Sequence, residues 1–219
     1  MAETIFPDRF EAGRRLADAL HGYAHKPDVL VLALPRGGVP VGFEVAQALG
    51  APLDVFVVRK LGLPWQPELA MGAIASGGVR VLNDEVVKAC QVSPDLLATV
   101  TAIETEELEQ REKLFRGSRP PPEIAGHTII VVDDGLATGS TMKAAVTALQ
   151  ALHPKRLVVA TPVSAADTAA WFQTHVDEFV CLQTPQQFMA VGLWYQDFQP
   201  TTDEEVRVLL ERAAQAQPV

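Results

Sequence analysis

Cysteine and long apolar segments are both scarce in this chain. Only Cys90 and Cys181 occur among its 219 residues, and they form no CxxC pair, so a reducing cytoplasm is a better expectation than a disulfide framework. No apolar run approaches the roughly 20 residues that span a bilayer. The first residues also lack the basic stretch and apolar stretch of a signal peptide. We therefore expect a cytoplasmic protein with no membrane partner.

Positive charge is scarce as well. The chain has 18 Lys and Arg against 27 Asp and Glu, which gives a formal net charge of −9. General binders of nucleic acid or of membrane surfaces depend on a basic face, so these two classes are disfavoured. Any anionic ligand must then be held by local donors. With 48% hydrophobic residues, the chain is long enough for one domain with an elaboration.

Short, β-branched apolar runs alternate along the chain with segments of helical period. Continuous runs of this kind are typical of strands buried on both faces, as in a parallel sheet. The alternation predicts a three-layer α/β/α fold with a mainly parallel sheet. The expected strands are 29–34, 53–58, 128–132, 157–160 and 178–182, and the expected helices are 10–20, 41–50, 141–153 and 165–175.

The alternation is interrupted at 66–118, which we interpret as an inserted α+β subdomain within a core formed by 1–65 and 119–219. Residues 70–82 predict a hairpin that turns at Ser76–Gly78, and 94–115 predicts a long charged helix. Near the C-terminus, four aromatic residues gather in 184–198 before a final helix at 201–213, for which Thr202 is a plausible N-cap. These rings could stack on a base, with Gln186, Gln187 or Asp197 reading its edge, but anchoring the last elements to the core is the favoured interpretation.

The stretch VVDDGLATGST, residues 131–141, carries the strongest chemical signal. Asp133 and Asp134 follow a predicted buried strand, and a loop of small and hydroxylated residues then leads into a helix. Such a loop offers backbone N–H groups and the positive end of the helix dipole to a phosphate, while the carboxylates can accept hydrogen bonds from a sugar diol. The loop lacks the lysine of a Walker A motif. A ribose 5-phosphate meets both demands, whereas a plain capping turn would explain a lone acid pair equally well.

Two other strand ends carry cationic residues. Arg36, Gly37 and Gly38 follow the strand at 29–34, where glycines let the backbone approach a ligand and arginine supplies a forked donor. Arg59 and Lys60 follow the run at 53–58, placed to neutralise a diphosphate. The purely structural alternatives are a Gly-rich turn for the stretch at Arg36 and an exposed strand end for Arg59 and Lys60.

VVDDGLATGST resembles the phosphoribosyl-pyrophosphate signature of the type I phosphoribosyltransferases, and RGG, RK and DDGxATG recur together in poorly characterised bacterial members. The resemblance implies that Asp133 and Asp134 bind the ribose 2- and 3-hydroxyls. It also implies that the pyrophosphate loop at Arg36 often contains a non-proline cis peptide and that 61–69 is a flexible loop. The residues implied to hold the 5-phosphate are Ala137, Thr138, Gly139, Ser140 and Thr141.

The reaction implied by this resemblance is transfer of a phosphoribosyl group to a nitrogenous base, with release of pyrophosphate. Arg36, Arg59, Lys60 and Mg²⁺ would stabilise the leaving group, and the metal would be held largely by substrate oxygens, with Asp133 and Asp134 contacting it directly or through water. The partners expected are phosphoribosyl pyrophosphate and a base, with no nucleic acid, and a homodimer is left open. A non-catalytic sensor of the same ligand is the alternative, and a nucleotide-monophosphate binder or hydrolase is disfavoured because it would not need all three cations.

Overall fold

The larger of two β-sheets forms the centre of the molecule. The computed structural model describes residues 5–216 and shows five parallel strands in the order β2-β1-β6-β7-β8. This confirms the mainly parallel sheet: the apolar runs of β1, β2, β6 and β7 are buried on both faces as expected, whereas β8, at the edge, is half-buried. The strands are β1 (Val29–Ala33), β2 (Leu53–Val55), β6 (Thr128–Val132), β7 (Arg156–Val163) and β8 (Glu178–Gln183).

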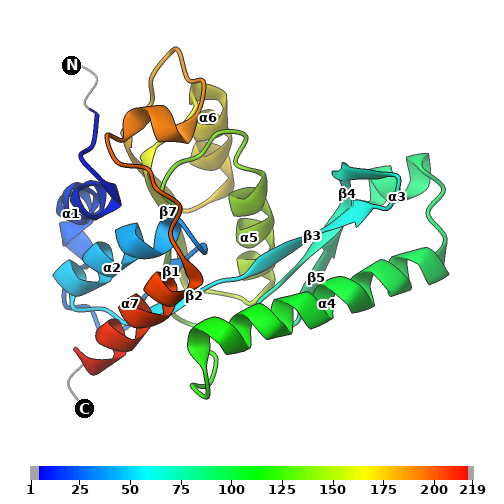
Figure 1. Cartoon of the computed structure of the whole chain (residues 1–219), viewed down its shortest axis with the longest axis horizontal. Helices are drawn as coiled ribbons and strands as arrows, with labels where there is room; N and C mark the ends of the chain where they lie inside the picture. Colours follow the sequence, from blue (N-terminus) through cyan, green and yellow to red (C-terminus); the bar gives the residue numbers. More distant parts are fainter. Residues whose placement is uncertain (1–4, 217–219) are drawn as a thin grey trace.

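Helices cover both faces of this sheet, which confirms the three-layer architecture (Figure 1). One face packs against α1 (Arg9–Ala19), α2 (Gly38–Leu49) and α7 (Asp203–Gln215). The other face packs against α5 (Ser140–Ala151) and α6 (Ala166–His175). Short 3-10 turns occupy His21–Tyr23 and Val191–Trp194.

The helix boundaries follow local chemistry in the sequence. Helix α2 ends at Gly50, which adopts a left-handed conformation with φ of 62°. Helix α7 begins with a complete capping box, in which Thr202 and Glu205 each bind the other's backbone N–H. Thr202 was expected as this N-cap, and the reciprocal bond from Glu205 is added by the structure.

The order of the strands places the loop that follows β1 beside the loop that follows β6. The chain passes from β1 to β2 on one side, and later returns to place β6 on the other side of β1. Strands β1 and β6 run parallel to each other. Val29 pairs with Thr128 at one end and Ala33 pairs with Val132 at the other, so the two strands end at the same level. In open α/β sheets, a crevice opens at such a change of direction, beyond the carboxyl ends of the strands.

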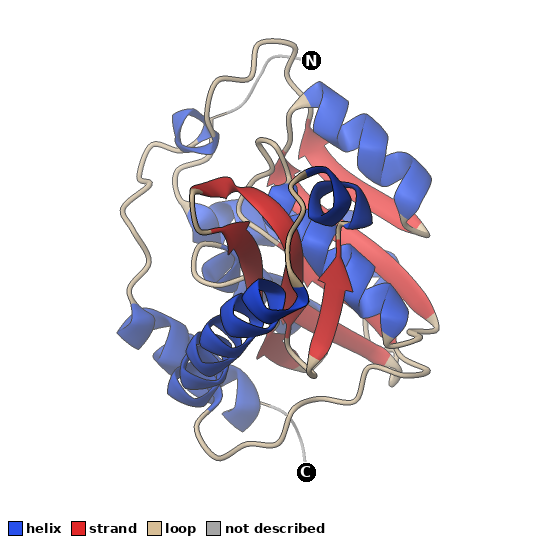
Figure 2. Cartoon of the chain, turned by 90° about the vertical axis from the view of Figure 1, so that its right-hand side faces the viewer, coloured by secondary structure: helices blue, strands red, loops and turns tan. Residues whose placement is uncertain are grey.

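A smaller antiparallel sheet extends away from the larger one together with a long helix (Figures 1 and 2). The turn at 76–78 and the long helix are confirmed, although the sheet already begins at Val58, ahead of the predicted insertion boundary at 66. Despite its 23 residues, the long helix α4 (Pro94–Arg116) is not apolar enough to cross a membrane, nor is any other helix within 5–216. The elements are β3 (Val58–Leu63), β4 (Gln66–Ala75), β5 (Val79–Leu82), α3 (Asp84–Ala89) and α4 (Pro94–Arg116).

The structure differs from the sequence predictions at two places in this region. The run 53–58 is not one strand, because β2 stops at Val55 and Val58 opens β3 in the second sheet. Both halves of the run are apolar, so hydrophobicity alone does not reveal the break. The segment 61–69, expected as a flexible loop, is the tip of the β3–β4 hairpin and turns at Pro64–Trp65.

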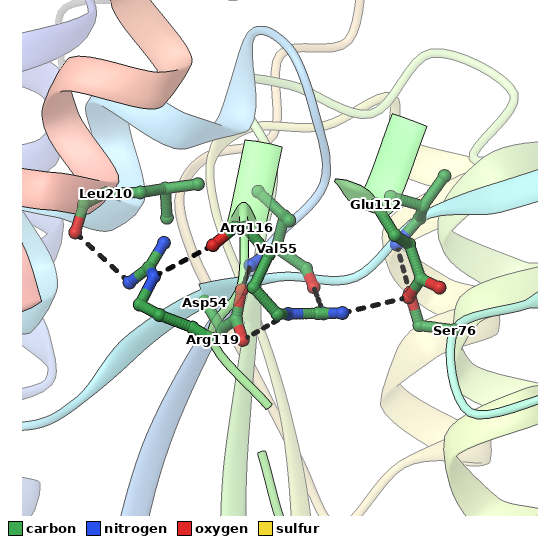
Figure 3. A network of polar contacts seen from close by, with 8 residues as sticks. Asp54, Val55, Ser76, Glu112, Arg116, Arg119 and Leu210 are labelled. Carbon is green, nitrogen blue, oxygen red and sulfur yellow. Dashed lines mark hydrogen bonds and ion pairs between the residues drawn. The ribbon is translucent and has the colours of Figure 1, made fainter. Parts of the chain in front are cut away.

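A buried ion pair joins α4 to the larger sheet (Figure 3). The Arg116 Nε donates to Asp54 Oδ2 at 2.9 Å, and the same guanidinium donates to Val55 O and Glu112 Oε1. Burial raises the pKa of Asp54, whereas the Arg116 charge opposes that rise. Arg116 therefore compensates an acid that the fold has removed from water.

Replacement of Arg116 should destabilise the protein strongly. Arg116→Ala leaves Asp54 buried without its cation, and loss of one partner of a buried pair typically costs about 3–5 kcal/mol. Urea unfolding measures this change. Arg111→Ala, an exposed arginine on the same helix, is the control and should shift the free energy of unfolding by less than about 0.5 kcal/mol. Equal effects of the two substitutions would contradict the assigned role.

Candidate active site

The acid pair lies directly beyond β6, whose five residues are all buried. Asp133 Oδ1 accepts a hydrogen bond from the Asp134 N–H at 2.9 Å. Burial raises the pKa of both carboxyl groups, and for Asp133 the neighbouring Asp134 charge raises it further, to well above its usual value. For Asp134, a hydrogen bond from Arg9 opposes the rise. The two acids are therefore electrostatically unequal.

The RGG loop after β1 contacts this acid pair. A Cβ added to Gly37 would come within 2.1 Å of Asp134 Oδ2, and one added to Gly38 would come within 2.7 Å of Val132 O. Only glycine fits at either position, because any side chain would overlap the acid-bearing loop. The Gly38 N–H donates to Leu34 O, so Gly38 contributes by close approach rather than as a free donor. The fold thus brings together two motifs that lie about a hundred residues apart.

The peptide bond between Pro35 and Arg36 is cis, as the resemblance implied for this loop. The Arg36 side chain is 47% exposed, and its Nη1 lies 3.5 Å from Asp203 Oδ1 at the start of α7. The C-terminal helix α7 thus contacts the RGG loop, and the sequence did not predict this contact.

The segment 137–141 consists of the loop that precedes α5 and the first two residues of that helix. Gly139 is its N-cap with φ of 67°, a left-handed conformation that favours glycine. The Thr168 hydroxyl donates to Ala137 O at 2.6 Å and fixes the loop from α6. The side chains of Thr138, Ser140 and Thr141 are exposed. The Thr138 and Ser140 hydroxyls hydrogen-bond each other at 2.9 Å, and the Ser140 N–H donates to Thr138 Oγ1 at 3.4 Å. The N-terminus of α5 is thus lined by exposed hydroxyl groups, a chemistry that suits a phosphate.

Arg59 and Lys60 are not at the end of a core strand, which corrects the sequence interpretation. Both lie in β3, where neighbouring side chains point to opposite faces of the sheet. The Arg59 Nε donates to Glu104 on α4 at 2.7 Å. Lys60 is exposed on the other face, which packs against α5. The two cations therefore do not act side by side.

Arg9 and Tyr195 contact Asp134 and were not identified as site residues. The Arg9 Nε donates to Asp134 Oδ2 at 2.8 Å, and the Tyr195 hydroxyl donates to Asp134 O at 2.5 Å. Tyr195 was noted only as one of the C-terminal aromatic residues. Trp194 and Tyr195 are 8% and 5% exposed, which agrees with the core interpretation of this segment. No local pattern marks Arg9, because its partner lies 125 residues away.

Protein groups alone do not form a metal site here. Within residues 5–216, no cluster of three or more His, Cys, Asp or Glu side chains could hold a metal ion. Asp133 and Asp134 supply two acids, which suits a divalent cation that brings further oxygen ligands from a substrate.

The closeness of Gly37 to Asp134 gives the first of two predictions for this site. Gly37→Ala should displace the Asp134 carboxylate and lower the free energy of unfolding by about 1–3 kcal/mol through overpacking. Backbone strain is not involved, because Gly37 has an ordinary φ of −61°. Thermal unfolding measures the change. Gly22→Ala is the control, since an added Cβ there meets nothing within 4 Å, and a similar loss in both variants would refute the steric account.

A second prediction concerns pH. Since the folded protein holds the Asp133 proton to a higher pH than the unfolded chain does, the contribution of Asp133 to stability should fall as the pH rises from about 4 through the raised pKa. Asp133→Asn cannot ionise, so its free energy of unfolding should exceed that of the wild type at pH 8 and approach the wild-type value near pH 4. Melting temperatures across this range test it. A difference that is independent of pH would count against the buried charge as its cause.

Known proteins resemble this chain in sequence and in fold. The profile of the phosphoribosyl transferase domain matches residues 4–196. A provisionally named phosphoribosyl transferase of Mycobacterium tuberculosis strain H37Rv is 48% identical over 209 residues, which make up 95% of this chain and 47% of that relative. The chain therefore spans about half the length of the curated relatives it matches.

The crystal structure of TT1426 from Thermus thermophilus is also similar. Its TM-score is 0.85 at 39% sequence identity, and the match covers 95% of this chain and 99% of that one. The shared fold and the family match together confirm the resemblance that rested on the DDGxATG stretch. This chain belongs to the phosphoribosyl transferase domain family.

Proposed function

We propose that the protein binds 5-phosphoribosyl 1-pyrophosphate with Mg²⁺ and transfers the phosphoribosyl group to a nitrogenous base, releasing pyrophosphate. The observation that carries this proposal is the contact between the RGG loop and the acid pair beyond β1 and β6. Together with the loop 137–141, it supports a site in which a candidate anion-binding loop lies on each side of two carboxylates. Membership of the phosphoribosyl transferase domain family supports the same reaction.

The ligand is proposed to lie across these three groups. The ribose hydroxyls donate to Asp133 and Asp134, and the 5-phosphate accepts from the hydroxyls and N–H groups of 137–141. The diphosphate lies along the backbone at Gly37 with Arg36 beside it. For Arg36 to turn to the diphosphate, its ion pair with Asp203 must open, and both side chains are exposed enough for this to cost little.

The transfer itself needs no covalent enzyme intermediate. A nitrogen lone pair of the base forms a bond to the anomeric carbon, while the bond from that carbon to the diphosphate oxygen breaks and its electron pair leaves with pyrophosphate. The base then loses a proton to solvent. Asp133 and Asp134 would hold Mg²⁺, directly or through water, together with oxygens of the ligand, and the bound ion would supply positive charge at the leaving group. Arg36 and Lys60 add to this charge, whereas Arg59 must first leave Glu104.

A sensor that binds the same ligand without turnover is the second candidate. It is favoured by the two ion pairs that engage Arg36 and Arg59, the cations expected to stabilise the leaving group. Both candidates share the ligand site and differ only in the release of pyrophosphate.

Calorimetric titration with phosphoribosyl pyrophosphate and Mg²⁺ tests the binding site. The wild type should bind, and Asp133→Asn or Asp134→Asn should each weaken binding at least about tenfold, because each removes a charged acceptor of a ribose hydroxyl. Asp18→Asn, an exposed acid near the other end of α1 from Arg9, is the control and should bind as the wild type does.

A screen of nucleobases for pyrophosphate release then separates the two candidates. Release with one base identifies a transferase and its acceptor, whereas tight binding without release from any base favours the sensor. Failure of the folded wild type to bind would refute both.

A further inference from the structure

Arg9 is a buried cation whose partners come from distant parts of the chain. Its side chain is 10% exposed, and it lies at the first turn of α1. The guanidinium donates to Asp134 Oδ2 and to Gln199 O, each at 2.8 Å, and lies 3.9 Å from the centre of the Phe198 ring. Arginine is rarely buried without such compensation, so this position is held by charge and stacking together.

One oxygen of Asp134 is enclosed by these contacts. Asp134 Oδ2 accepts from Arg9 on one side and approaches the Gly37 backbone so closely that even a Cβ there would overlap it. The Tyr195 hydroxyl holds the carbonyl of the same residue. Asp134 therefore has a fixed orientation, and its Oδ2 faces protein rather than a ligand.

The charge of Arg9 also changes what the acid pair can attract. Two adjacent carboxylates without a cation form an attractive site for a divalent metal, because Mg²⁺ and Mn²⁺ prefer carboxylate oxygen. The same two negative charges would repel a polyanionic ligand such as a diphosphate ester. Arg9 neutralises one of them at the position closest to the RGG loop.

We propose that Arg9 is a positioning residue that makes the site select a metal–diphosphate complex over the free metal ion. It orients Asp134 for the ribose and withholds Asp134 Oδ2 from a metal. The divalent cation therefore enters on the phosphoribosyl pyrophosphate, whose oxygens complete its ligands. This inference rests on the proposed function for its ligand, but its free-metal consequence can be measured without that ligand.

Mn²⁺ is the probe, followed by the electron paramagnetic resonance signal of the free ion. The wild type should bind Mn²⁺ weakly when no phosphoribosyl pyrophosphate is present. Arg9→Gln should bind it at least tenfold more tightly, and should bind the Mn²⁺–phosphoribosyl pyrophosphate complex at least tenfold more weakly. Arg9→Met, which keeps an unbranched side chain against the Phe198 ring, serves as a second neutral variant should Arg9→Gln fail to fold.

Three controls separate charge from packing. Arg9→Lys keeps the charge but loses the fork, so it should retain the weak Mn²⁺ binding of the wild type, which a merely structural role would not predict. Arg14→Met removes an exposed arginine from the same helix and should change nothing. The double variant Arg9→Gln/Asp134→Asn should lose the gained Mn²⁺ affinity, since the metal needs both acids.

Unchanged Mn²⁺ affinity in folded Arg9→Gln would overturn the inference, as would a gain that persists when Asp134 is also replaced. Failure of the wild type to bind the metal–ligand complex would overturn the proposed function instead. The free-metal titration would still decide whether Arg9 shields Asp134.

Discussion

The close approach of the RGG backbone to the acid pair is the constraint on which the site depends. It requires β1 and β6 to be neighbours, to run parallel and to end at one level. The observed register meets all three conditions, since Val29 pairs with Thr128 and Ala33 pairs with Val132. The close approach also requires residues without side chains at Gly37 and Gly38. Local sequence and global topology thus serve one contact, and neither motif would form the site alone.

Two carboxylates that the fold largely buries are each compensated by a buried arginine. Asp54 and Asp134 are both removed from water by the fold, and each is paired with a buried arginine from a remote segment, Arg116 and Arg9 respectively. Within residues 5–216, Asp133 forms no ion pair with a cation, and its pKa is raised well above the usual value by burial and by the Asp134 charge. Buried pairs of this kind are weak contributors to net stability but are costly to break. They therefore fix the positions of segments that lie far apart along the chain.

Periodicity predicted most of the larger sheet, because buried parallel strands are short, continuous apolar runs and their helices carry clear stop and capping residues. The ends of β1 and β6 could be predicted as a site for the same reason, since their polar residues follow such runs directly. The pairing of Arg9 with Asp134 could not, because no local pattern encodes a contact across 125 residues. Arg59 was wrongly expected at the end of a core strand. The apolar run 53–58 contains the point where the chain leaves the larger sheet for the smaller one, and its composition does not reveal that point.

The arm formed by β3–β5 and α4 has a consequence for how the protein unfolds. Its inner side chains, among them Leu61, Met71, Leu108 and Phe115, belong to the same continuous hydrophobic cluster as residues of β1, α2 and α7. An element that has no separate core cannot melt by itself without exposing apolar surface of its neighbours. The protruding arm and the sheet that bears the acids should therefore unfold in one cooperative transition, and damage at the arm should reach the site as lost stability of the whole chain.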